Sequence, residues 1–314
     1  AEIHLVYDTV PPTEIVIRTD GKWTAYDADQ IYNPTGNSGC GWYYYPQENL
    51  NASVMPPGTP LSATESSRTA PIGAGWHPVE KQAPFDAPMT AKPTDPVAVL
   101  PEELPAILVK EVSSGHFFFD LGREVQGGVR LQIRLPPELV NASAASRAVT
   151  VRLGEELKDG LILYPPRTGM HQQSTWTLAR TSELQTLSHH EYFEFRYGEL
   201  FFGGDTHTNG ISTRTPIRGG QFNVSAWVVR TPFDKNIAAD MKCSNDVLSS
   251  VWELCRYTIE AAPLDLYTDS NARQRSADCI ADDVTAMRSH YSTSSQLALQ
   301  KYATEQIIAN GPDN

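Results

Sequence analysis

The chain has 314 residues, of which 40% are hydrophobic and 20% charged, and its formal net charge at pH 7 is −12. This composition is typical of a folded protein that is long enough for two or three domains. The negative charge argues against a nucleic-acid or anionic-membrane surface, because phosphate groups bind to clustered basic side chains. No run of about 18 apolar residues is present, so the sequence predicts no transmembrane helix.

The first third of the chain combines strand patterns with a Pro-rich stretch. Alternating polar and apolar residues predict three short strands, at 3–7, 14–18 and 22–25. Residues 56–105 are rich in Pro, Ser, Thr and Ala. Such a composition is typical of loops that cover a β domain, or of a linker.

Short strands at regular spacing dominate the middle of the chain. They are predicted at 107–109, 115–120, 129–134, 149–153, 173–178, 192–196, 199–202 and 222–229. Many short strands separated by turns are typical of a β-sandwich, and we expect that fold here.

After residue 243 the hydrophobic period changes from that of a strand to that of a helix. The stripe of a first predicted helix consists of Val247, Leu248, Val251, Leu254, Cys255, Thr258 and Ile259. Ser244 is the expected N-cap of this helix. Two further helices are predicted at about 279–291 and 294–309, and the Asn-Gly-Pro sequence at 310–312 ends the last one.

These three helices have apolar stripes that need partners. The β domains of the chain can cover one face of each helix at most, and an uncovered apolar stripe is unfavourable in water. We therefore predict that a stable structure needs more helices, and that another polypeptide supplies them.

The four cysteines do not form a recognisable metal or redox motif, because no Cys-x-x-Cys is present. Cys243 and Cys255 lie near the start and well inside the first predicted helix, which places them too far apart for a disulfide. Two interpretations stay open for the remaining thiols: a bond between Cys255 and Cys279, or buried free cysteines.

Five segments of the chain carry motifs in an informative order. They are 118–128 (FFDLGREVQGG), 151–156 (VRLGEE), 192–197 (YFEFRY), 243–248 (CSNDVL) and 269–282 (DSNARQRSADCIAD). Collinear, they resemble the patterns fDfGqNxxG, lrhgE, FtyhGFRY, csnplln and DCPqREErlGWtGD of bacterial and fungal α-L-rhamnosidases of glycoside hydrolase family 78. The resemblance covers nearly the whole chain and is least secure over 30–105.

The resemblance implies two β-sandwich (jelly-roll-like) domains followed by the first helices of an (α/α)6 barrel. The expected domains are 1–105, a β-sandwich with a candidate carbohydrate-binding role, 106–238, a second β-sandwich, and 239–314, the incomplete barrel. The chain would then be the N-terminal part of an inverting glycosidase that removes terminal α-L-rhamnose from plant glycosides or polysaccharides. The rest of the barrel, including the general base, is expected on a second polypeptide, as in a nicked or two-chain enzyme, and no cofactor is implied.

The residues from 265 to 283 are dense in carboxylate and guanidinium groups, which suit a sugar pocket. By position, Asp269, Arg273 and Asp282 match family residues that hold the rhamnose hydroxyls. From spacing alone, the same segment also fits a solvated, charged helix start.

The proton donor is where the chain departs from the family. An inverting glycosidase needs a protonated acid and a carboxylate base about 6.5–9.5 Å apart. The family's acid falls on Arg275, which stays positively charged and cannot donate the proton, although it can bind substrate. The family's pocket Trp falls on Cys279. A shifted register would make Asp278 or Asp282 the acid, and we take Asp278 as the candidate; its alternative role is a helix N-cap.

Two other functions compete with this hypothesis. An enzyme of the same fold with altered chemistry, such as a rhamnosyl-uronate lyase, could use Arg275 to neutralise a substrate carboxylate. A non-catalytic carbohydrate-binding subunit would instead use the β domains, where residues 42–45 (WYYY) and Trp76 could stack on sugars or pack in a core.

Histidines outside this segment offer weaker candidates. His189 and His190 are adjacent, so on a strand they point to opposite faces, and we expect a solvent-exposed pair and not a metal site. His116 and His207 stand alone in the sequence, so no metal site is predicted.

Three Asn-x-Ser sequons begin at Asn51, Asn141 and Asn223. Such sequons are acceptors for N-glycosylation in secreted proteins. We therefore expect a secreted, extracellular glycoprotein. The N-terminus has no basic-then-apolar signal segment, so any such segment is expected to have been removed already.

Overall fold

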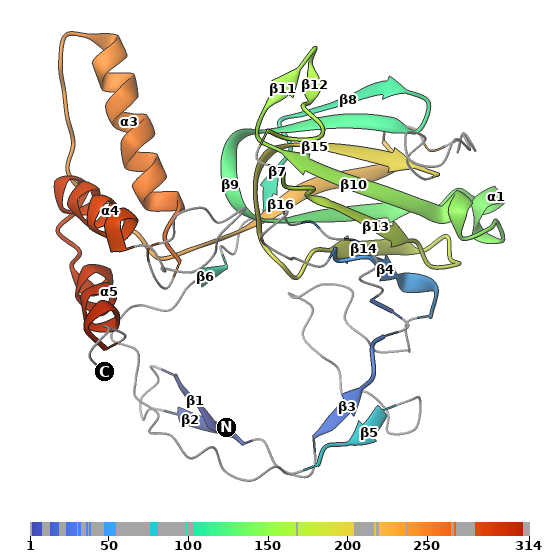
Figure 1. Ribbon diagram of the computed structural model, residues 1–314. Helices are drawn as coiled ribbons and strands as arrows, with labels where there is room; N and C mark the ends of the chain where they lie inside the picture. The colour runs from blue at the N-terminus through green and yellow to red at the C-terminus, as the bar shows by residue number, and fades with distance from the viewer. Residues whose placement is uncertain are drawn as a thin grey trace.

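The computed structural model describes most of the chain beyond residue 103 and shorter stretches before it. Its described residues are 2–7, 13–18, 23–29, 31–32, 47–54, 76–80, 98–99, 103–167, 169–203, 220–236, 238–264 and 280–309, with the single positions 36, 38, 217 and 267. Strands dominate these ranges, and three longer helices follow them (Figure 1). No helix among them is long and apolar enough to cross a membrane.

One ten-stranded sheet forms the centre of the molecule. Its main path runs in the order β4 (Leu50–Asn51), β13 (Gln173–Thr177), β10 (Ala148–Gly154), β15 (Phe193–Phe202), β9 (His116–Arg134), β16 (Phe222–Arg230) and β6 (Ala98–Val99). Beside this path, β8 (Leu108–Ser113) and β14 (Leu184–Ser188) pair with β9, and β7 (Leu104–Pro105) pairs with β16. Strands β4 and β6, which precede residue 105, thus share one sheet with the strands that follow it. The predicted domain boundaries stay a prediction.

Strand β9 organises this sheet because its two halves have different neighbours. The first half pairs with β8 and β15, and the second half pairs with β14 and β16. A glycine in the left-handed region, Gly122 at φ 82°, and a register shift between Phe195 and Tyr197 mark the change. A Cβ on Gly127 would lie 1.8 Å from the carbonyl oxygen of Trp227, so glycine is required where β9 and β16 meet.

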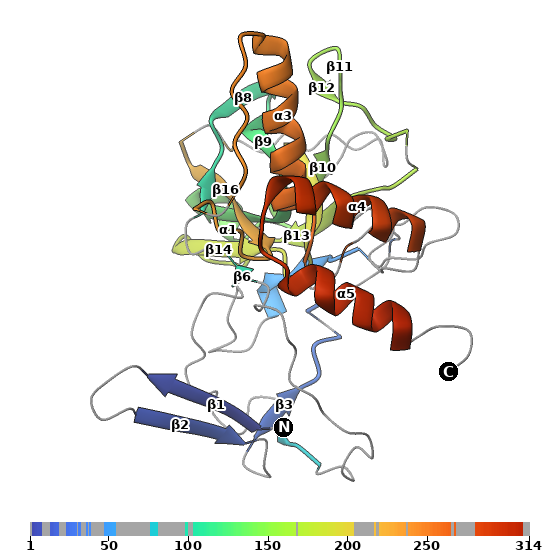
Figure 2. The same cartoon turned by 90° about the vertical axis from the view of Figure 1, so that its left-hand side faces the viewer.

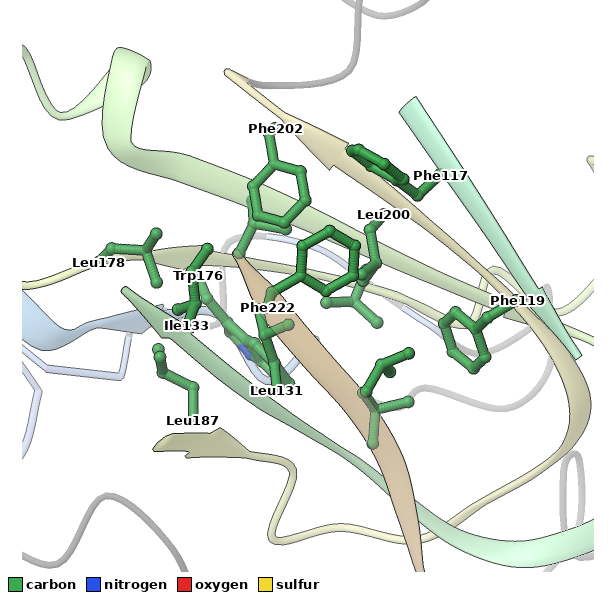
Figure 3. Close-up of a cluster of buried hydrophobic side chains, with 14 of the residues drawn as sticks. Phe117, Phe119, Leu131, Ile133, Trp176, Leu178, Leu187, Leu200, Phe202 and Phe222 are labelled. Atoms are coloured by element: carbon green, nitrogen blue, oxygen red, sulfur yellow. The ribbon is translucent and has the colours of Figure 1, made fainter. Parts of the chain in front are cut away.

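The core lies between the two halves of the folded sheet. Phe119, Leu131, Ile133 and Trp176 are completely buried there. Figure 3 shows that phenylalanine rings from β9, β15 and β16 converge in this cluster, where Phe117 and Phe222 meet edge to face at 4.9 Å. Strand β10 is buried along its whole length, so both of its faces are covered.

Smaller elements surround the sheet. They are the antiparallel pairs β1 (Glu2–Tyr7) with β2 (Thr13–Arg18), β3 (Thr24–Tyr26) with β5 (Trp76–Pro78), and β11 (Leu157–Lys158) with β12 (Leu161–Ile162), together with α1 (Pro137–Val140), η1 (Ala52–Val54) and η2 (Ala145–Arg147).

Three helices follow the sheet: α3 (Asp246–Ala261), α4 (Ile280–Thr293) and α5 (Ala298–Ala309). The N-cap of α3 is Asn245, whose side chain accepts hydrogen bonds from the backbone of Val247 and Leu248, so the prediction of Ser244 as the cap is wrong by one residue. Figures 1 and 2 show that these helices lie at one side of the sheet and do not form a closed unit of their own.

The strand predictions for the middle of the chain agree with the structure, with two differences. The segments predicted at 115–120 and 129–134 belong to the single strand β9, and those at 192–196 and 199–202 belong to β15. Strand β14 and the β11–β12 pair were not among the predicted strands. The chain is therefore mostly β-sheet with a few helices, as predicted.

Candidate functional site

Most of the predicted sugar-binding residues lie outside the described residues. This is the case for Asp269, Arg273, Arg275 and Asp278. Asp282 is part of helix α4, but the position of its side chain is not described. The substrate-binding and acid roles of these residues stay predictions.

One residue inside the predicted segment is well placed. Tyr267 is almost completely buried against Leu299 and Ala303 of α5. Its hydroxyl lies 2.6 Å from Nδ1 of His290 on α4, and burial lowers the pKa of that histidine, which favours the neutral ring. Tyr267 is thus in contact with both α4 and α5.

A wide apolar groove separates α3 from the end of α4. The empty space in this groove, which includes open solvent, is about 1150 Å³. Its lining consists of Met241, Cys243, Leu248, Val251, Trp252, Cys255, Thr258, Ile259, Ser289, Ser292 and Thr293. The predicted stripe of α3 is largely uncovered: Val247 is 70% exposed and Leu254 is 65% exposed. The apolar face of α3, which was expected to need further helices, is therefore open to solvent.

The cysteine predictions have a mixed outcome. Cys243 and Cys255 are free and exposed, so the expectation of buried free thiols is wrong for both. Cys40 and Cys279 lie outside the described residues, and Cys255 has no disulfide partner among the described ones.

The C-terminal end of α3 is held on the sheet by hydrogen bonds. The amide Nε2 of Gln126 on β9 donates to the carbonyl oxygens of Ala261 and Ala262, at 2.5 and 2.7 Å. The Tyr257 hydroxyl donates to the carbonyl oxygen of Glu124 at 2.5 Å. Helix α3 is thereby anchored at its last turns and projects away from the sheet at its start (Figure 1).

A buried carboxylate reinforces the same junction. Glu260 is buried near the end of α3, and its carboxylate pairs with Arg230 of β16. Lys235 and Arg256 approach the same carboxylate at 3.6 Å. Three cations around one buried acid compensate for its loss of hydration.

Three glutamates with mutual electrostatic coupling come from the family-like motifs. Glu124 lies on β9, Glu155 follows β10 and Glu194 lies on β15. Partial withdrawal from water and repulsion by the other two raise the pKa of Glu124 to about 8. The pKa of Glu155 rises to about 7, mainly because of partial withdrawal from water and then repulsion by Glu194 and Glu156. Near neutral pH such carboxyl groups hold protons, a property that general acids need.

These three residues were not among the predicted site residues. The signal was present, because each of the segments 118–128, 151–156 and 192–197 contributes one glutamate. Their convergence depends on the antiparallel pairing of β15 with both β9 and β10, which no local pattern reveals. Among the described residues, no group of three or more His, Cys, Asp or Glu side chains is arranged to hold a metal ion.

The prediction of an exposed histidine pair is wrong for His189. Its ring is buried between Trp176 and Phe193, and Nδ1 accepts a hydrogen bond from the backbone of Val129. Burial lowers the pKa of His189 to about 4. His190 is exposed as expected, and its Nδ1 lies 2.6 Å from the Glu48 carboxylate.

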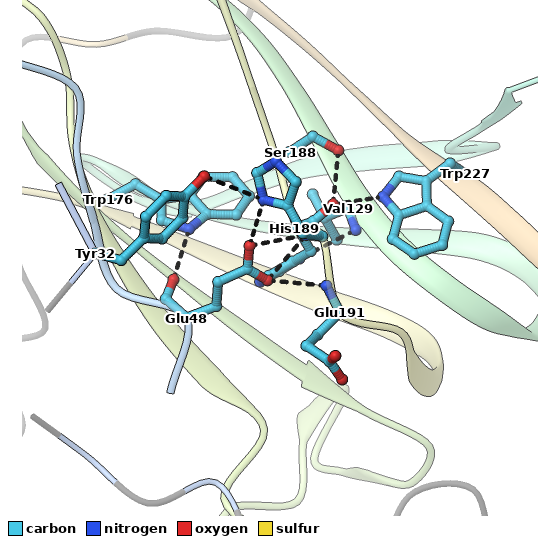
Figure 4. A network of polar contacts seen from close by, with 9 residues as sticks. Tyr32, Glu48, Val129, Trp176, Ser188, His189, Glu191 and Trp227 are labelled. Atoms are coloured by element: carbon cyan, nitrogen blue, oxygen red, sulfur yellow. Dashed lines mark hydrogen bonds and ion pairs between the residues drawn. The ribbon is translucent and has the colours of Figure 1, made fainter. Parts of the chain in front are cut away.

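Glu48 connects the first third of the chain to the sheet (Figure 4). Its carboxylate accepts hydrogen bonds from the backbone of His190 and Glu191, and its backbone carbonyl accepts one from the indole of Trp176. The bonds to His190 and the charge of the two histidines lower the pKa of Glu48 although burial raises it. This network has satisfied partners throughout, so we interpret it as structural.

The remaining candidates also have structural surroundings. His116 lies 2.7 Å from the buried Glu199 carboxylate and stacks on Phe201, while His207 and residues 42–45 lie outside the described residues. Trp76 packs beside Tyr26 at 5.5 Å.

The sequons differ in accessibility. Asn141 and Asn223 are exposed. The side-chain oxygen of Asn51 instead accepts hydrogen bonds from the backbone and hydroxyl of Ser53.

Comparisons with known proteins give matches in structure only. No protein-family model matches the sequence, and no curated protein matches it. An α-L-rhamnosidase from Streptomyces avermitilis, solved with L-rhamnose, matches 98% of this chain and 26% of its own length, with a TM-score of 0.64 and 20% identity.

Two other solved structures give the same result. The α-L-rhamnosidase from Aspergillus terreus matches 86% of this chain and 27% of its own, with a TM-score of 0.56 and 17% identity. The α-L-rhamnosidase from Dictyoglumus thermophilum matches 70% of this chain and 22% of its own length, with a TM-score of 0.51 and 16% identity. The chain thus spans about a quarter of the length of these enzymes. At such low identity the likeness concerns the fold, and over that quarter the chain has the fold of α-L-rhamnosidases.

Proposed function

We propose that this chain is part of a glycoside hydrolase that removes terminal α-L-rhamnose from plant glycosides or polysaccharides with inversion. The sheet would correspond to jelly-roll-like β-sandwich domains, and α3–α5 to the first helices of an (α/α)6 barrel. The observation that carries the proposal is the open apolar face of α3, in a chain that shares its fold with about a quarter of the α-L-rhamnosidases from Streptomyces avermitilis and Aspergillus terreus. The active site would be completed by a second polypeptide that carries the remaining helices.

The roles of individual residues follow from the motif match. Asp269, Arg273, Arg275 and Asp282 would hold the sugar, and Asp278 would donate the proton to the leaving oxygen. Tyr267 precedes Asp269 by two residues, and its burial against α5 and its contact with His290 of α4 support this proposal. The general base would come from the partner.

Exposed apolar residues on α3 give a direct test of the partner. Val251→Asp would place a charge in the groove, and Leu254→Asp would place one on the exposed apolar stripe of α3. Leu184→Asp would place a charge on β14, where the leucine is similarly exposed. We expect the first two variants to lose a second polypeptide that co-purifies with the native protein, and Leu184→Asp to retain it. A denaturing gel that shows only the 34.7 kDa chain in the native, active protein would contradict the two-chain proposal.

Activity tests the chemistry. The native protein should release reducing L-rhamnose from an aryl α-L-rhamnoside, and the first-formed sugar should have the inverted anomeric configuration by NMR. Asp269→Asn should raise KM, whereas Asp278→Asn should lower kcat by at least about 100-fold if it is the acid. Unchanged kcat in Asp278→Asn would remove this residue from the mechanism.

A lyase is the second candidate, because Arg275 occupies the family's acid position. Arginine can pair with a substrate carboxylate but cannot protonate a leaving group. A lyase would convert a rhamnosyl-uronate into an unsaturated uronate that absorbs in the ultraviolet, and the hydrolase would not.

The three sequons motivate a proposal about location. Exposure of Asn141 and Asn223 supports a secreted glycoprotein. Treatment of the native protein with an N-glycosidase should increase its mobility on a denaturing gel, and an unchanged mobility would argue against glycosylation.

A further inference from the structure

A small pocket lies where the sheet meets the end of α3. Its walls come from β9, β16, α3 and the segment after β16, and the empty space at the pocket, which includes open solvent, is about 390 Å³. The polar side chains that line it are Arg123, Gln126, Arg230, Lys235, Tyr257 and Glu260. None of its lining residues belongs to the segment from 269 to 282, to which the proposed rhamnosidase chemistry is assigned.

Gln126 presents a buried acceptor at this pocket. The side chain is 3% exposed, and its Nε2 is fully used by two carbonyl oxygens of α3. Because carbonyl oxygens only accept, the orientation of the amide is determined, and Oε1 is the remaining atom. This oxygen has no hydrogen-bond partner among the described residues, an arrangement that costs about 1–3 kcal/mol unless a donor reaches it.

The charges around the pocket are unbalanced. Arg123, Arg230 and Lys235 line it, and Glu260 is the carboxylate that lines it with them. Glu260 pairs with Arg230 and is also approached at 3.6 Å by Arg256 and Lys235. One carboxylate thus faces three cations, and Arg123 adds a further positive charge to the lining, which leaves an excess of positive charge. The neighbouring Glu124 does not cancel this excess at neutral pH, because its pKa is raised to about 8.

We propose that this pocket binds a small hydroxycarboxylate, such as a sugar acid. The carboxylate would pair with Arg123 and Lys235, and a hydroxyl would donate to Oε1 of Gln126. A simple anion satisfies the cations and leaves the buried acceptor unpaired. A neutral sugar satisfies the acceptor and leaves the cations without a counter-charge. The combination of both groups distinguishes the expected ligand.

Calorimetry on the full 314-residue chain tests this proposal with D-glucuronate as the probe, at constant ionic strength. Glucuronate should bind at least about ten times more tightly than D-glucose or acetate. Lys235→Ala and Arg123→Ala should each weaken the binding about tenfold, and Lys110→Ala on β8 should leave it unchanged. Both substituted cations have exposed side chains, so the variants should fold.

Two results would overturn the proposal. Equal binding of glucose and glucuronate would show that the cations play no part, and equal binding of acetate would show a general anion site without selection by Gln126. A comparison of free gluconate with methyl glucuronoside then distinguishes a free sugar acid from the acidic end of a glycan. The readout is binding and not rhamnoside hydrolysis. The pocket proposal can therefore fail while the proposed glycosidase activity stands, and the glycosidase proposal can fail while glucuronate binding stands.

Discussion

The sheet and the helices of this chain differ in how they bury apolar side chains. Phe119 and Trp176 in the sheet are completely buried, and the indole of Trp176 has a hydrogen-bond partner. On α3, apolar residues such as Leu254 lie in solvent, and the buried Nε1 of Trp252 has no partner among the described residues. The sheet therefore buries its apolar side chains within the chain, whereas α3 leaves much of its apolar stripe exposed, a feature that is typical of interaction surfaces.

The largest expected effect comes from truncating one apolar side chain in the sheet and one on α3. Phe119→Ala should destabilise the chain by about 3–5 kcal/mol, because it removes a fully buried ring from a packed core. Leu254→Ala should change the stability of the isolated chain by less than about 0.5 kcal/mol. Urea unfolding followed by tryptophan fluorescence gives both values. A comparable loss in the two variants would contradict the contrast.

Acid should destabilise the sheet through His189. Above pH 6.5 the ring is neutral in both folded and unfolded chains. Between pH 6.5 and 4 the unfolded chain gains a proton that the folded chain excludes, so stability falls as the pH falls. The loss amounts to about 3 kcal/mol for a pKa lowered to about 4.

Urea unfolding between pH 8 and 4 measures this loss. His189→Gln retains an acceptor for the Val129 amide but does not titrate, so its stability should depend less steeply on pH over this window. An equal slope in the two proteins would show that other groups cause the acid sensitivity.

A smaller effect concerns the connection between the two regions. Gln126→Leu removes the two hydrogen bonds that Gln126 donates to the end of α3, with an expected loss of about 1–2 kcal/mol for the attachment of the helix. Amide hydrogen exchange should accelerate about tenfold in α3 and remain unchanged in β10. Gln132→Leu, in the part of β9 that pairs with β14, is the matched control and should leave exchange in α3 unchanged.

Local sequence patterns predicted the elements better than their relations. The helical period placed α4 within two residues of its observed ends, and the stripe from Val247 to Ile259 identified the face of α3 that is uncovered. The same approach divided β9 at its glycines, because a glycine usually interrupts a strand. Gly127 instead permits the close approach of Trp227, a contact that involves a residue 100 positions away in the chain.

The candidate site shows the same limit. His189 and His190 have equivalent local patterns, yet only His189 is enclosed by rings from β13 and β15. The three glutamates Glu124, Glu155 and Glu194 come together only once the register of β15 is known. The family resemblance predicted a sugar-binding segment between 269 and 282, which stays a prediction, whereas the convergence of distant strands could be seen only in the structure.

The smallest expected effect lies at the junction of the two regions. The pKa of Glu124 is raised to about 8 from an ordinary 4.5, so between these values the folded chain retains a proton that the unfolded chain has lost. Stability from this group therefore decreases as the pH rises from 4.5 through 8. Glu124→Gln cannot ionise, so we expect it to raise the melting temperature modestly at pH 9 and not at pH 4, because solvent screens this partly exposed carboxyl.

A second substitution tests the cause of this shift. Glu194 contributes repulsion to both Glu124 and Glu155, so Glu194→Gln should lower the pKa of both carboxyls when these are followed by NMR titration. Glu183→Gln, on the exposed loop before β14, should leave both unchanged. If Glu194→Gln moves neither pKa, the three carboxyls are not electrostatically coupled.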